Sequence, residues 1–220
     1  MSAVVPHQFL FRFSIPVHRV ARLPKRGRML LNLPTECRLP AFGELDDVQP
    51  FGELRIGWNE KGVGVSVDVR GKRERPRCRI EEPTESDGLQ LWVDTRNTQS
   101  IHRASRFCHH FCVLPAGAGG ESQQQPASVQ LPIARAREDA PLVKSAPIGT
   151  SVQMRPDGYQ LEVWLPAESL NGFDPEANPS LGFYYLLQDS ELGEQFLTVG
   201  REFPFAHDPS LWCTLELIRE

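Results

Sequence analysis

The sequence predicts an all-β fold, an antiparallel β-sandwich of the immunoglobulin-like kind, and three observations lead to it. Apolar and polar residues alternate with a period of two in repeated short stretches, which is typical of strands with one buried face. Nineteen prolines and seventeen glycines interrupt the 220 residues, and no long amphipathic helix pattern occurs. Hydrophobic residues make up 40% of the chain, which is enough for the core of one large domain.

The clearest strand is "GVGVSVDV", residues 62–69, in which the four valines share one face. The preceding stretch "GELRIGWN", residues 52–59, leads into it through "NEKG", which is typical of a tight hairpin turn. "DGLQLWVD" and "DGYQLEVWLP" alternate in the same way. Further strands are expected at residues 9–15, 129–134, 181–189, 194–200 and 211–218, and one short helical turn at residues 166–173.

One region lacks this alternation of apolar and polar residues. "PAGAGGESQQQPAS", residues 115–128, is rich in Gly, Ala, Gln and Pro, and we expect it to be a loop. With the residues that follow, up to Pro147, it forms a predicted insertion between two core strands, with the strand at 129–134 inside it.

Charge and composition argue against several classes of partner. The chain has 24 basic and 28 acidic residues, a net charge of −4, so nucleic acid is not the expected partner.

Pro6, His7, Arg12 and Pro16 interrupt the apolar run that a signal peptide needs, and no segment approaches the ~18 to 20 apolar residues of a membrane helix. We therefore expect a cytoplasmic protein without a membrane partner. Five scattered cysteines favour free thiols over a disulfide framework.

The densest group of metal-type ligands is "RFCHHFC", residues 106–112. Its alternation predicts a strand with Cys108, His110 and Cys112 on one side and His109 on the other, beside the phenylalanines. Same-face neighbours on a strand lie roughly 6.6 Å apart, whereas zinc ligand atoms converge to about 4 Å. His102 is a further candidate ligand whose position nothing in the sequence fixes. The pattern favours buried thiols and packed imidazoles, so we expect no metal site and no cofactor.

Catalytic motifs do not occur in the sequence. No GxSxG, HExxH, P-loop or GxGxxG pattern is present, so we do not expect an enzyme. Carboxylate-rich stretches such as "ELDD" and "RIEEPTESD" are typical of solvated loops, and calcium binding through their oxygens stays open as an alternative.

Two of the four tryptophans are out of pattern. Trp92 and Trp164 fall on the polar side of their strands, next to Gln90 and Glu162. Either the insertion or the N-terminal segment covers them, or they form a surface that stacks a flat ligand while Gln and Glu supply hydrogen bonds. Trp58 and Trp212, in contrast, are expected in the core.

The order of these stretches resembles the family 9 carbohydrate-binding modules, within the wider group of DOMON-like sandwiches. The resemblance covers residues 42–220 and leaves residues 1–41 as an N-terminal segment with a strand that packs on the sandwich. Six stretches carry it: "FGELDD", "IGWNEKGVGVSVDVRGK", "ESDGLQLWVDTR", "DGYQLEVWLPAESL", "LGFYYLLQDSELGEQ" and "HDPSLWCTLELI".

The resemblance implies a β-sandwich that binds sugar on one face without catalysis. Carried over position by position, this face holds Cys108 and Leu186 and seven ligand-binding candidates, which are Gln90, Trp92, His110, Glu162, Trp164, Tyr184 and Gln188. The two loop tryptophans that clamp a sugar ring in the family correspond to Thr84 and Ala206 here. The family's arginine and asparagine correspond to Cys108 and His110. Phe203 and Phe205 are candidate substitutes for the missing aromatic surface.

The resemblance therefore implies a carbohydrate-binding-like module with an unknown or altered ligand. Two alternatives stay open. The first is a DOMON-like domain that binds haem or a metal, for which Met29 and Met154 are the internal methionine candidates. The second is a structural or interaction domain whose sugar face is covered by its own chain.

Overall fold

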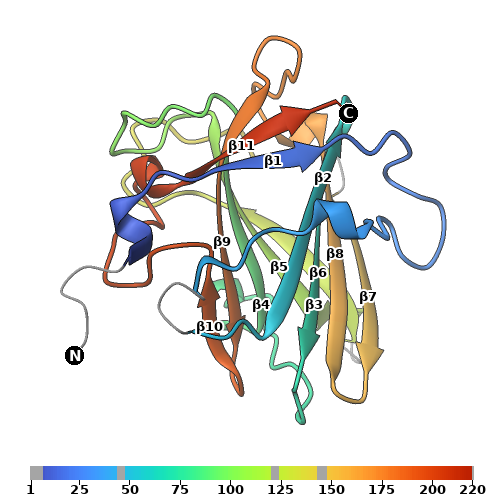
Figure 1. Ribbon diagram of the computed structural model, residues 1–220. Helices are drawn as coiled ribbons and strands as arrows, with labels where there is room; N and C mark the ends of the chain where they lie inside the picture. Colours follow the sequence, from blue (N-terminus) through green and yellow to red (C-terminus); the bar gives the residue numbers. More distant parts are fainter. Residues whose placement is uncertain (1–6, 44–47, 120–123, 143–147, 220) are drawn as a thin grey trace.

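Two β-sheets packed face to face form the protein, as Figure 1 shows for the computed structural model, which describes residues 7–43, 48–119, 124–142 and 148–219. The larger sheet has the strand order β1-β11-β9-β4-β5-β6, with β10 beside β9, and the smaller sheet has the order β2-β3-β8-β7. All neighbours pair antiparallel except β1 and β11, which are parallel. The predicted antiparallel sandwich is therefore confirmed.

The strands follow the predicted stretches closely. Their bounds are β1 Ser14–His18, β2 Gly52–Asn59, β3 Gly62–Arg70, β4 Gly88–Asp94, β5 Cys108–Ala118, β6 Gln125–Leu131, β7 Gly149–Arg155, β8 Gly158–Pro166, β9 Ser180–Asp189, β10 Gly193–Phe196 and β11 Cys213–Ile218. Short 3₁₀ helices are η1 His7–Leu10, η2 Thr35–Cys37, η4 Pro83–Glu85, η6 Ala167–Ser169 and η7 Pro209–Leu211. In the described parts of the chain, no helix has the length and apolar character to cross a membrane.

Several elements differ from the prediction. Strand β7 was not predicted, and β6 spans Gln125–Leu131 where a strand was expected at residues 129–134. The strand expected at residues 9–15 lies at Ser14–His18, because its partner is β11 at the far end of the chain. The strand expected at 194–200 ends at Phe196. The stretch 115–128 is not one loop, because β5 continues to Ala118 and β6 begins at Gln125, where the two strands pair across a register shift. Residues 44–47 of "FGELDD", and 120–123 and 143–147 of the predicted insertion, lie outside the described residues.

The core lies between the two sheets. Val63, Val65, Val67 and Val69 of β3 are at most 2% exposed, and they face the inner residues of β4, β5 and β9. Trp58 and Trp212 are buried in this core as predicted. Their indole nitrogens donate to backbone carbonyls, to Val17 at 3.0 Å and to Phe205 at 2.7 Å, so neither ring leaves an orphaned polar group.

The N-terminal segment closes one seam of the sandwich. After β1 has paired with β11 of the larger sheet, Arg19 forms a parallel bridge to Trp58 at the edge of the smaller sheet. The chain then crosses the outer face of the smaller sheet and returns along β2, where the Leu39 amide donates to the Leu54 carbonyl at 2.9 Å. The edge strand β2 is covered in this way, which shields its free backbone groups.

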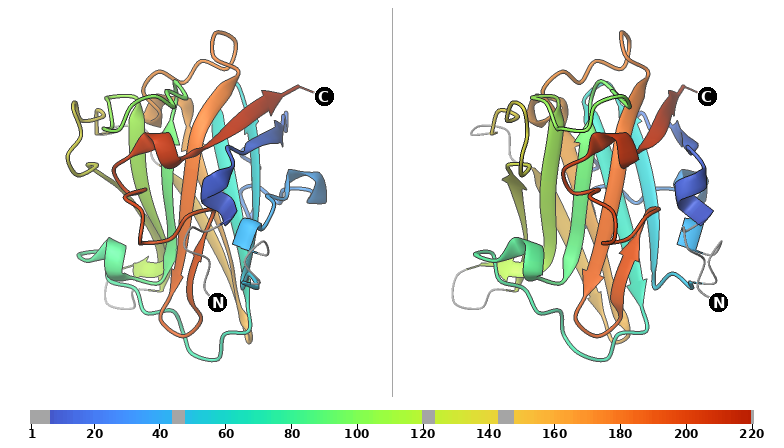
Figure 2. Two further views of the ribbon diagram at one scale, coloured as in Figure 1. Left: turned by 60° about the vertical axis from the view of Figure 1, so that its left-hand side comes forward. Right: turned by 90° about the vertical axis from the view of Figure 1, so that its left-hand side faces the viewer.

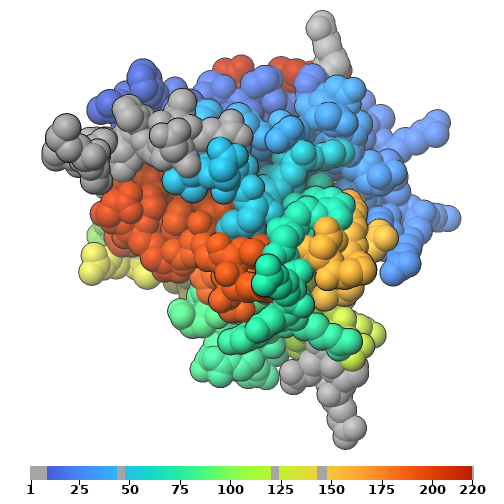
Figure 3. Space-filling view, turned by 60° about the horizontal axis from the view of Figure 1, so that its bottom comes forward, coloured from blue at the N-terminus to red at the C-terminus, as the bar shows by residue number. Residues whose placement is uncertain are grey.

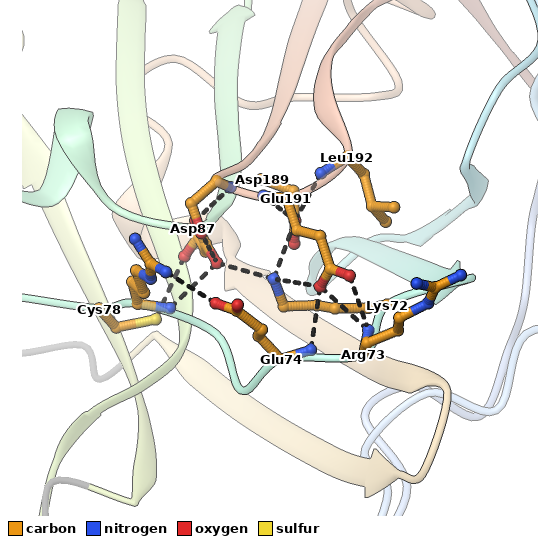
Figure 4. A network of polar contacts seen from close by, with 10 residues as sticks. Lys72, Arg73, Glu74, Cys78, Asp87, Asp189, Glu191 and Leu192 are labelled. Atoms are coloured by element: carbon orange, nitrogen blue, oxygen red, sulfur yellow. Dashed lines mark hydrogen bonds and ion pairs between the residues drawn. The ribbon is translucent and has the colours of Figure 1, made fainter.

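A buried lysine joins the two sheets at one end (Figure 4). Lys72, separated from the end of β3 by Gly71, places its ammonium 2.9 Å from Asp189 at the end of β9 and 3.2 Å from Asp87 before β4. Its side chain is 1% exposed, and Glu191 lies 3.8 Å away. Burial lowers the pKa of Lys72, but the bonds and charges of the two aspartates outweigh it and leave this pKa raised.

Replacement of Lys72 by methionine should destabilise the fold strongly. Methionine fills similar space but leaves Asp87 and Asp189 without a cation, and breaking a buried pair typically costs about 3–5 kcal/mol. We expect a loss of this size in the free energy of unfolding, measured by urea titration. The exposed Lys61→Met variant is the matched control and should change it by less than about 0.5 kcal/mol. A loss below about 1 kcal/mol for Lys72→Met would contradict the assignment.

Candidate functional site

The outer face of the larger sheet brings together five of the predicted ligand-binding residues. Directly paired residues of antiparallel strands point to the same side. Trp92 of β4 pairs with His110 of β5 and with Tyr184 of β9, and Gln90 pairs with Cys112 and Leu186. Gln188 follows on the same side of β9, opposite Gly88. We call this surface the β4 face.

The other two predicted residues lie elsewhere. Glu162 and Trp164 belong to β8 in the smaller sheet and point out from the opposite side of the sandwich. The prediction that Trp92 and Trp164 share one face is therefore wrong. Its cause is physical, since a period of two shows which residues of a strand share a side but not which sheet the strand joins.

The N-terminal segment covers Glu162 and Trp164. Glu162, fully buried, accepts hydrogen bonds from the amides of Leu31 and Asn32, both at 2.8 Å, and from the Ser151 hydroxyl at 3.1 Å. Trp164 packs in a small cluster with four side chains of this segment, Leu23, Leu31, Leu33 and Cys37. A Cβ at Gly64 would lie 2.8 Å from Leu31, so this glycine permits the close approach. These contacts give both side chains a structural role.

Aromatic rings of the protein itself fill the centre of the β4 face. The Trp92 ring stacks on His110 at 4.3 Å between centroids, and Phe205 meets Trp92 edge-on at 5.5 Å. Phe205 also stacks on Tyr184 at 4.5 Å, and the Tyr184 hydroxyl donates to the Val199 carbonyl. Figure 2 shows the segment between β10 and β11 crossing in front of this sheet. Trp92, Tyr184 and Phe205 are consequently at most 3% exposed.

The side chains around His110 are electrically neutral. Its Nε2 lies 3.2 Å from Oε1 of Gln90 and 3.7 Å from Sγ of Cys112. Burial lowers the pKa of His110 to about 4 and raises the pKa of Cys112 to about 12. His110 and Cys112 thus offer a metal one imidazole and one protonated thiol. In the part of the chain that the structure describes, no three His, Cys, Asp or Glu side chains gather as a metal site.

The remaining metal and haem candidates lie apart from His110. His102 is exposed and contacts Asp208 at 3.1 Å. His109 points to the inner side, as predicted, with its ring 6.0 Å from Phe111. Met154 lies on β7 of the other sheet, and Met29 lies in the segment that covers that sheet.

The open part of the β4 face is polar. Arg201 donates through Nε to both carboxylate oxygens of Glu194, at 2.7 and 2.9 Å, and through Nη2 to Gln188 at 3.2 Å. The hydrogen bonds and the charge of Glu194, with the charge of Glu85, raise the pKa of Arg201. We call Glu85, Gln188, Glu194 and Arg201 the polar cluster. The sequence did not single out Arg201 or Glu194, because Arg201 follows β10 in an irregular segment and no periodicity marks it.

Thr84 and Ala206, which the resemblance aligns with the clamping tryptophans of family 9 modules, both lie next to residues of this face. Gln90 donates to the carbonyl of Thr84 at 3.2 Å, which places that loop at one end of the face. Ala206 follows Phe205, which covers Trp92 at the centre of the face. Neither Thr84 nor Ala206 supplies an aromatic ring.

No family model and no curated protein matches the sequence. Solved structures, however, are similar in fold. A carbohydrate-binding module of family 9 from Caldicellulosiruptor kristjanssonii, in complex with cellotriose, matches with a TM-score of 0.61 and 12% identity, covering 94% of this chain and 95% of that one. The fold is that of the family 9 carbohydrate-binding modules.

Two further structures agree. A family 9 module from the same organism, in complex with glucose, matches at TM-score 0.57 and 11% identity over 94% of this chain and 97% of that one. A candidate carbohydrate-binding protein from Bacteroides uniformis matches at TM-score 0.52 and 13% identity over 94% and 99%. The predicted resemblance to family 9 modules is thus confirmed at the level of fold. It extends beyond residues 42–220, because the matched share includes most of the N-terminal segment.

Acid should destabilise the protein through its buried histidines. Burial lowers the pKa of His110 from 6.5 to about 4, so the unfolded chain binds a proton that the folded chain rejects between these pH values. Stability is therefore full above about pH 6.5 and falls towards pH 4, by on the order of 3 kcal/mol for this residue. A His110→Phe variant, which can keep the stack on Trp92, should lose that part of the pH dependence.

The measurement is the free energy of unfolding by urea titration at several pH values from 7 to 4. A substitution of the exposed His102 by glutamine is the matched control, because it also removes one imidazole but leaves the buried stack on Trp92 intact. A parallel pH dependence in wild type and His110→Phe would contradict the prediction, because it would show that His110 binds its proton equally well in the folded and unfolded chains.

Proposed function

We propose that this chain is a non-catalytic binding module of the carbohydrate-binding type, with a ligand that differs from those of the similar structures. One observation carries the proposal. The polar cluster is open to solvent at the edge of the β4 face, the face that the family resemblance assigns to sugar, and Arg201 is 58% exposed over its side chain. Two of the structures with the same fold are complexes with cellotriose and glucose.

The chemistry of the polar cluster suits hydroxyl groups. Gln188 presents an amide, Arg201 presents donors in a planar fork, and Glu194 presents acceptors, so neighbouring hydroxyls can both donate and accept. Phe205 occupies the space over Trp92, which leaves the indole unavailable for stacking. We therefore infer recognition of the edge of a small neutral saccharide by hydrogen bonds.

The arrangement of the carboxylates supports binding rather than catalysis. Hydrolysis of a glycosidic bond ordinarily uses one protonated and one ionised carboxyl group on either side of that bond. Both carboxylate oxygens of Glu194 accept hydrogen bonds from Arg201, so this carboxylate is engaged in positioning the arginine of the polar cluster.

The burial of the aromatic rings on the β4 face supports a second candidate function. Trp92, Tyr184 and Phe205 are covered by the protein's own chain, which favours a structural or interaction domain that has lost its sugar site. The two candidates differ in one respect, since only the first predicts saccharide binding by the isolated protein.

Saccharide binding should depend on the polar cluster. We expect a glycan array, followed by calorimetric titration with the best neutral saccharide, to detect binding, with glucose and cellotriose as first probes. The double variant Gln188→Ala/Arg201→Ala removes at least two hydrogen bonds of about 0.5–1.5 kcal/mol each, so its affinity should fall by about tenfold or more.

Two controls make this result specific. Arg219→Ala removes an exposed arginine 3.9 Å from Glu176 and should leave the affinity unchanged. Trp164→Ala should change stability alone, because the N-terminal segment covers this ring. If neither wild type nor a Phe205→Ala variant binds any neutral glycan, the face is only a covered surface and the proposal is wrong.

A further inference from the structure

The charge of this chain is unevenly divided. Residues 1–35 contain six basic residues and no acidic one, whereas the other 185 residues carry the remaining 18 basic and all 28 acidic residues, a net charge of −10. The overall value of −4 hides this division. Such a charge asymmetry between parts of a chain points to an anionic partner for the basic part.

Four of the six basic residues lie in one loop, residues 22–28, which we call the basic loop. It contains Arg22, Lys25, Arg26 and Arg28. Figure 1 shows the chain around these residues projecting from the side of the sandwich, and in Figure 3 the same blue segment stands out at the right-hand edge.

Both ends of the basic loop are fixed to the smaller sheet. At one end Leu23 is 4% exposed, and its backbone carbonyl accepts a hydrogen bond from the side-chain amide of Asn59 at 3.0 Å. At the other end Leu31 is fully buried, and Leu30 donates its backbone amide to Ser151 at 3.2 Å. The loop is therefore presented by a rigid support, and between the two buried leucines it exposes Arg26 and Arg28 beside Pro24, while Met29 and Leu30 are half-buried.

Among the described residues, no carboxylate pairs with the arginines of the basic loop. The side chains of Arg22, Arg26 and Arg28 form no hydrogen bond or ion pair with any residue that the structure describes, and all three residues are exposed. Lys25 donates to a backbone carbonyl, that of Asn32, at 3.1 Å. Glu162, the nearest buried carboxylate along this segment, is fully occupied by three donors.

We propose that the basic loop is a contact surface for an acidic polysaccharide, a chain that bears carboxylate or sulfate groups. A projecting loop with four like charges suits a polymer that passes over it, and guanidinium groups pair with carboxylate and sulfate in the same planar geometry. The surface lies on the opposite sheet from the polar cluster, so it goes beyond the proposed function and does not depend on it.

The composition of the basic loop favours a polysaccharide over two other polyanions. Proteins that hold single-stranded nucleic acid combine basic with aromatic side chains, and residues 19–28 contain no aromatic residue. Surfaces that dock on lipid insert large apolar side chains, whereas in residues 22–28 Leu23 is buried and the exposed apolar residue is the small Pro24. Recognition by charge alone remains, which an acidic polysaccharide satisfies.

The test is a binding measurement on the full chain with immobilised heparin and polygalacturonate as probes. Wild type should bind at least one of them at about 50 mM salt and lose affinity steeply as salt is raised. The double variant Arg26→Ala/Arg28→Ala should bind about tenfold or more weakly. Heparin and polygalacturonate together distinguish sulfate from carboxylate recognition.

A matched variant controls for the change in net charge. Arg75→Ala/Arg137→Ala removes two exposed arginines outside residues 1–35 and should bind as wild type does. Gln188→Ala/Arg201→Ala should likewise keep polyanion binding, even if it abolishes binding of neutral saccharide. Equal losses in the Arg26/Arg28 and Arg75/Arg137 variants, no binding by wild type, or tighter binding to oligothymidylate or phosphatidylglycerol vesicles would each overturn the proposal.

Discussion

The ammonium of Lys72, buried between Asp87 and Asp189, fixes the end of the sandwich from which the candidate site is built. Asp189 ends β9 next to Gln188, and its Oδ1 also accepts the amides of Glu191 and Leu192 in the turn to β10. That turn sets the position of Glu194, and Glu194 in turn holds Arg201. The geometry of the polar cluster thus depends on an ion pair that ties the smaller sheet to the larger one.

Each sheet has an outer face with a tryptophan, and the chain covers the two in different ways. The N-terminal segment hides Trp164 by pairing backbone amides with a buried carboxylate, and glycine at position 64 allows the close fit. The segment before β11 hides Trp92 with a single aromatic side chain, Phe205, and leaves the neighbouring polar cluster open. The N-terminal segment thus covers the part of the smaller sheet around Glu162 and Trp164, whereas the larger sheet keeps the polar cluster accessible beside its covered tryptophan.

The sequence predicted those features that depend on one strand at a time. Alternation correctly placed the β3 valines inward and put His109 and His110 on opposite sides of β5, because the pleat alone decides this. Alternation also placed Trp164 correctly on the outer side of its strand. It did not show that this strand belongs to the smaller sheet, so Trp164 was wrongly expected on the same face as Trp92. Strand β1 was misplaced because its partner lies about 200 residues away, and Arg201 was missed because only tertiary contacts bring it to Gln188.

The supports of the basic loop explain how a positive segment can stay extended beside an acidic body. Unrestrained, four like charges would be drawn back onto the carboxylates of the other 185 residues. Burial of Leu23 and Leu31 fixes both ends, and Glu162 is saturated by donors from the backbone of Leu31 and Asn32 and from Ser151. Glu162 thus holds the backbone after the loop in place instead of pairing with its arginines, which leaves them available to an external anion.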